Sequence, residues 1–141
     1  NLMPVRKTDS KANLCAKGAY ELSPAKGAAK VSLFASGSEV EIAMAAQAQL
    51  AEKGIAARVV SVPSLTRLLA LSDAERAAII GDAPVNIAIE AGIRMGWDQV
   101  IGPKGAFIGM NSFGASAPYK ELYAQFGITA ENAVKEAMAR L

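Results

Sequence analysis

Short apolar runs alternate along the chain with longer segments in which apolar positions recur at helical spacing. The runs at 31–35, 57–62, 85–90 and 105–110 have the length of strands, and a weaker run at 18–22 predicts a further short strand. Helices are predicted between residues 39 and 54, 64 and 69, 72 and 81, 119 and 125, and 129 and 141. The chain therefore alternates strands with helices.

This alternation determines the predicted fold class. A strand, a helix and a second strand form a right-handed crossover, which makes the two strands parallel. Five strands with intervening helices predict an α/β domain with three layers, α/β/α, around a mainly parallel five-stranded sheet. The first strand has no helical crossover behind it, so the pattern leaves open an antiparallel edge position for it.

The turn after the 31–35 run carries the first candidate site. Ser36 with Glu39, or Ser38 with Glu41, has the Ser-x-x-Glu spacing of a capping box that begins a helix. Such a helix start also presents backbone amides to an anion. Gly37 stands without the further glycines of a dinucleotide turn or the Gly-Lys-Ser/Thr of a P-loop, so capping and ligand binding both stay open.

A second candidate site follows the 85–90 run. Glu90 is the last residue of that predicted strand, and Ala91 and Gly92 come directly after it. A carboxylate at the carboxyl end of a parallel strand lies where open α/β sheets bind ligands, although it can equally hold a neighbouring loop. Ser36, Gly37, Ser38, Glu90 and Gly92 are therefore the candidate ligand-binding residues.

Composition limits the class of protein further. The 141 residues suit one domain at 18–141, and the polar, aperiodic stretch 1–17 predicts a connector to a preceding part of a longer chain. The net charge is +2 with no run of Lys or Arg, which argues against a nucleic-acid partner. No apolar run approaches membrane-spanning length and no signal-peptide pattern opens the chain, so we expect a cytoplasmic protein without a membrane partner.

The residues for self-sufficient catalysis are missing. The sequence contains no histidine, which removes the commonest general base and metal ligand, and its single cysteine, Cys15, has no partner for a Cys-His pair. Glu39 and Glu41 would point about 200° apart on a helix, so they do not form a catalytic pair. We therefore predict no catalytic, cofactor-binding or metal-binding residue in this chain.

Several motifs together resemble one family. The segments 35–40 (ASGSEV), 58–64 (RVVSVPS), 90–97 (EAGIRMGW) and 113–118 (FGASAP), in this order and spacing, resemble the C-terminal domain of transketolase. Deoxyxylulose phosphate synthase and the beta chains of oxo-acid dehydrogenases carry a similar module. The Ser-x-Pro-Ser and Phe-Gly-Ala-Ser-Ala-Pro segments look like transketolase rather than either of these.

The resemblance implies a transferase of carbohydrate metabolism that uses thiamine diphosphate and Mg²⁺ or Ca²⁺. It moves a two-carbon ketol unit from a ketose phosphate to an aldose phosphate, in the pentose phosphate pathway or in carbon fixation. The family's cofactor and substrate motifs lie upstream of this domain, so none of its catalytic residues maps onto this sequence. The fragment is then expected to be inactive and to bind no cofactor itself.

Within that family, the domain is expected to have a structural role in the packing of domains and subunits. Its partners would be the upstream domains of the same chain and a second subunit of a homodimer, with Phe113, Ser116 and Pro118 as candidate interface residues. An apolar surface near 1–17 and 113–118 would then be exposed in the isolated fragment. The alternatives are a small anion- or nucleotide-binding regulatory module at the carboxyl ends of the parallel strands, and a stand-alone interaction module.

Overall fold

The computed structural model describes residues 18–37, 39–90, 96–102, 105–109 and 128–141. Its strands are β1 (Tyr20–Ser23), β2 (Val31–Ala35), β3 (Ala57–Ser61), β4 (Val85–Glu90) and β5 (Ala106–Gly109). Its helices are α2 (Glu39–Glu52), α3 (Leu65–Ala70), α4 (Asp73–Ile80), α5 (Asp98–Ile101) and α7 (Ala130–Arg140). The predicted alternation of strands and helices is confirmed over this part of the chain.

The five strands form one mixed sheet in the order β1-β3-β2-β4-β5. Strand β2 lies at the centre and pairs in parallel with β3 and with β4, and β4 pairs in parallel with β5. Strand β1 pairs antiparallel with β3 and forms one edge. The predicted fold class is confirmed, and the position that the sequence left open for the first strand is an antiparallel edge.

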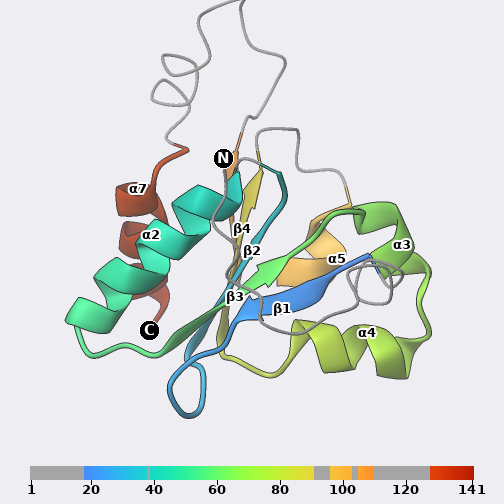
Figure 1. The fold of residues 1–141 in the computed structure, drawn as a ribbon, viewed down its shortest axis with the longest axis horizontal. Coiled ribbons are helices and arrows are strands. Elements are labelled where there is room, and N and C mark those ends of the chain that lie inside the picture. Colours follow the sequence, from blue (N-terminus) through green and yellow to red (C-terminus); the bar gives the residue numbers. More distant parts are fainter. Residues whose placement is uncertain (1–17, 38, 91–95, 103–104, 110–127) are drawn as a thin grey trace, which may run out of the picture.

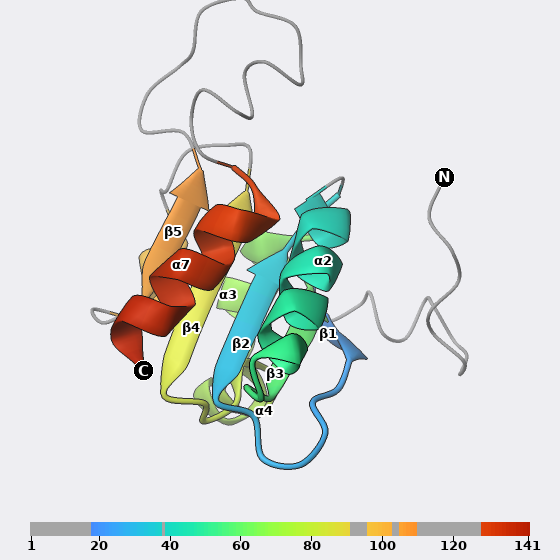
Figure 2. The same ribbon diagram turned by 90° about the vertical axis from the view of Figure 1, so that its left-hand side faces the viewer.

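Two helical layers cover the two faces of the sheet. Helices α2 and α7 lie on one face, while α3, α4 and α5 lie on the other (Figure 1). Figure 2 shows α2 and α7 side by side in front of the sheet. Alternate residues of β2 serve the two layers, with Leu33 facing α2 and α7 and Phe34 facing the opposite helices.

The helix ends follow local sequence signals. Ser64, Ser72 and Thr129 each accept a hydrogen bond from a backbone N–H in the first turn of α3, α4 and α7. The helix start predicted at Ser72 is confirmed, with Glu75 N donating to Ser72 Oγ at 3.2 Å. Gly54 follows α2 in a left-handed conformation (φ 78°), as expected of a glycine that ends a helix.

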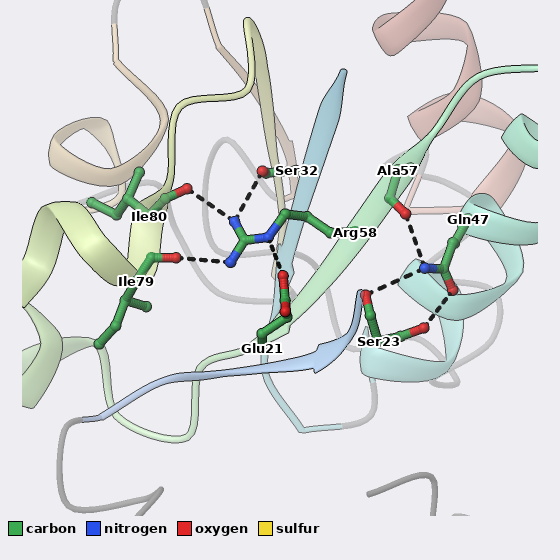
Figure 3. A network of polar contacts seen from close by, with 8 residues as sticks. All are labelled: Glu21, Ser23, Ser32, Gln47, Ala57, Arg58, Ile79 and Ile80. Atoms are coloured by element: carbon green, nitrogen blue, oxygen red, sulfur yellow. Dashed lines mark hydrogen bonds and ion pairs between the residues drawn. The ribbon is translucent and has the colours of Figure 1, made fainter. Parts of the chain in front are cut away.

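Arg58, on β3, connects the centre of the sheet to α4 (Figure 3). Its guanidinium donates to Ser32 Oγ at 3.1 Å and to the backbone carbonyls of Ile80 and Ile79 at 3.0 Å each, and it pairs with Glu21 at 2.6 Å. Only 12% of the Arg58 side chain is exposed. The same group therefore satisfies a fully buried hydroxyl and the last carbonyls of α4.

The structure contains one helix that the sequence pattern does not predict. The short helix α5 was not predicted, because a single turn beginning at Asp98 is too short to establish a helical period. The predicted helix at 119–125 and the predicted connector at 1–17 lie outside the described residues. No helix in the described ranges is both long enough and apolar enough to cross a membrane.

Replacement of Arg58 by methionine, which keeps an unbranched stem but removes the guanidinium, tests this connection. We expect Arg58→Met to lower the free energy of unfolding by about 2–4 kcal/mol, because buried acceptors lose their donor. Chemical denaturation measures the loss. The exposed Arg67 on α3 provides the control, and Arg67→Met should change stability by less than about 0.5 kcal/mol. Equal effects of the two substitutions would contradict the assignment.

Candidate functional site

The carboxyl ends of β2 and β4 meet at the point where the sheet reverses its order. From β2 the chain crosses by α2 to β3 on one side, and from β3 it returns by α3 and α4 to β4 on the other side of β2. Adjacent strands whose connections leave on opposite faces open a crevice at their carboxyl ends, where α/β proteins bind ligands. Figure 2 shows these ends at the upper edge of the sheet.

Ser36 and Glu90 come together at this point. Ala35 of β2 is in register with Ile89 of β4, so the two residues that follow lie side by side. The hydroxyl of Ser36 donates a hydrogen bond to Oε1 of Glu90, across a separation of 54 residues in sequence. Two of the predicted site residues are thus in direct contact.

The turn between β2 and the start of α2 lies beside Ser36 at this edge. The amides of Glu39 and Val40 donate to the carbonyls of Ser36 and Gly37 at 3.1 and 3.2 Å, so the turn itself uses them. Glu39, in the first helical turn, is only 5% exposed. Helix α2 begins at Glu39, and the choice between the Ser36 and Ser38 capping registers stays a prediction because position 38 lies outside the described residues.

Gly37 and Gly109 contribute in different ways. Gly37 adopts a left-handed conformation (φ 57°), and an added Cβ there would have no atom within 4 Å. Gly109 of β5 pairs with Glu90 of β4 and has no such room, because an added Cβ would lie 2.4 Å from the Glu90 carbonyl oxygen. Gly37 is required by backbone conformation, and Gly109 by the close approach of neighbouring atoms.

The Glu90 carboxylate, which accepts a hydrogen bond from Ser36, decides what this edge can bind. An anion placed between Ser36 and Gly37 would lie beside the Glu90 carboxylate and would have to replace it as the acceptor of the Ser36 hydroxyl. Like charges at such a distance repel, and the helix start is already acidic through Glu39 and Glu41. The arrangement suits a neutral or cationic hydrogen-bond donor better than a phosphate.

The other predicted site residues cannot be placed. Ser38 and Gly92, from the candidate ligand-binding set, and Phe113, Ser116 and Pro118, from the candidate interface set, lie outside the described residues. Of the eight positions singled out from the sequence, the structure places Ser36, Gly37 and Glu90.

The described residues do not fit a metal or a diphosphate cofactor. Within the described ranges no group of three or more Cys, Asp or Glu side chains is arranged to hold a metal ion. At the described part of the carboxyl edge, the Ser36 hydroxyl is bound to the Glu90 carboxylate. No chemical step through such a group can be assigned to this part of the chain.

A shallow pocket of about 370 Å³ lies at the opposite end of the sheet, and the sequence patterns did not predict it. It is lined mainly by small and apolar residues, together with Ser23, Lys26 and Gln47. Figure 3 shows that the Gln47 amide is occupied, since Nε2 donates to the Ala57 carbonyl at 3.0 Å and Oε1 accepts from Ser23 Oγ at 3.0 Å. Gln47 therefore joins α2 to β1 and β3.

Sequence reasoning also missed the roles of Gln47 and Arg58. The available signal for Arg58 was a charged residue inside the apolar run 57–62, where a charge needs a partner. The available signal for Gln47 was its position at helical spacing with Val40, Ala43 and Leu50, because a glutamine on the buried side of a helix needs a hydrogen-bond partner. Neither signal identifies the partners, because they lie far away in sequence.

The fold is an α/β domain, and Ser36 and Glu90 lie at the edge of its sheet where such domains commonly bind ligands. The described residues contain no arrangement of side chains that we can assign to catalysis. The family model described as "Transketolase-like TK C-terminal domain" matches residues 18–129. The chain belongs to the transketolase family and corresponds to its C-terminal domain.

Similar proteins agree with this assignment. Transketolase from Sinorhizobium medicae is 51% identical over 138 residues, which cover 97% of this chain and 20% of the relative. Transketolase from Cereibacter sphaeroides is 47% identical over 141 residues, covering 100% of this chain and 21% of the relative. In the solved structure of transketolase from Leishmania mexicana, the matching part has a TM-score of 0.80 and 34% identity and covers 92% of this chain and 19% of that one. The chain thus spans about a fifth of the length of these relatives.

The role of Gln47 can be tested against a neighbour on the same helix. Gln47→Leu should lower the free energy of unfolding by about 1–2 kcal/mol, because the Ala57 carbonyl loses its side-chain donor and α2 loses its link to β1. The Gln49 side chain donates to the exposed Glu131 at 3.1 Å, so Gln49→Leu should cost less than about 0.5 kcal/mol. Urea denaturation compares the two, and a smaller loss for Gln47→Leu would refute the structural role.

Proposed function

We propose that this chain is a supporting domain of a transketolase, the enzyme that transfers a two-carbon ketol unit from a ketose phosphate to an aldose phosphate. The observation that carries the proposal is the 51% identity to a transketolase over nearly the whole of this chain and a fifth of the relative. The active enzyme would then consist of this domain and the much longer remainder of the same polypeptide.

Thiamine diphosphate and a divalent metal ion, Mg²⁺ or Ca²⁺, belong to that remainder in this proposal. The described part of the chain offers no metal-binding cluster, and the chain has no histidine. The complete enzyme would act on sugar phosphates of the pentose phosphate pathway, as a homodimer in the cytoplasm. The thiamine cofactor supplies the carbanion chemistry when bound, and this chain supplies no group to it.

The contribution of the domain itself is structural. Three of its polar side chains, Arg58, Gln47 and Ser36, bind other groups of the same domain. Such contacts hold helices and strand ends in fixed positions rather than leaving reactive groups available. The domain alone is therefore expected to be inactive, and its effect on activity would pass through domain and subunit packing, with 113–118 as the predicted contact segment.

The mass of the native polypeptide tests this proposal directly. An antibody raised against this domain should detect a chain several times heavier than 14.6 kDa in the source cells, and ketol-transfer activity should co-purify with it. Depletion of the extract with the same antibody should remove that activity. A native chain of about the size of this domain would refute the proposal, as would a long chain without ketol-transfer activity.

The second function suggested by the sequence, a small anion- or nucleotide-binding regulatory module, remains a prediction. The position of Ser36 and Glu90 at the point of strand-order reversal favours a ligand site, whereas the carboxylate of Glu90 disfavours an anion there.

A titration distinguishes the two functions. We expect the amide chemical shifts of Ser36, Gly37 and Glu90 to stay unchanged when orthophosphate, a sugar phosphate or a nucleotide is added, because the carboxylate repels these ligands. The amides around Lys26 and Gln47, at the other end of the sheet, serve as the internal comparison. Saturable shifts confined to the Ser36–Glu90 edge would support the regulatory function instead.

A further inference from the structure

We draw no further inference here: the strongest candidate, the shallow pocket that Lys26 and Gln47 line between the second half of α2 and the loop after β1, has its Gln47 amide and Ser23 hydroxyl bound to each other within the domain, and nothing in the described part of the structure shows what would fill it.

Discussion

The burial of β2 on both faces is the constraint on which the rest of the structure depends. All five residues of this strand are fully buried, so each face of the sheet needs its own helical layer. The strand also carries a hydroxyl, Ser32, into the interior, where an unpaired polar group is costly. Arg58 supplies the donor for Ser32 and, with the same guanidinium, binds the end of α4. The central strand and an outer helix are thereby coupled through one side chain.

The same central strand decides where the candidate site lies. Because β3 and β4 flank β2 and their connections run on opposite faces, the ends of β2 and β4 lie side by side at the point where α/β sheets commonly bind ligands. In this domain a serine and a glutamate occupy that position and bind each other. A place where related architectures accept ligands is used here for a contact within the domain, which agrees with a supporting role in a larger enzyme.

Local signals in the sequence were sufficient for much of the fold. The Ser-x-x-Glu box at Ser72 and the cap at Thr129 act within one helical turn, and the apolar runs match the strands to within about two residues. The short helix α5 escaped prediction because one turn has no period. The roles of Arg58 and Gln47 escaped it for another reason, since their partners lie up to 37 residues away in the chain.

The sequence by itself determined the class of the domain, the order of its elements and its family, because apolar periodicity, capping residues and motif order are local properties of the chain. The tertiary structure alone decided that β1 is an antiparallel edge, that Ser36 donates to Glu90, and that Arg58 binds both Ser32 and the end of α4. Each of these facts depends on which segments become neighbours after folding. The spacing of residues along the sequence does not show which segments become neighbours. The packing of the sheet between its two helical layers determines this.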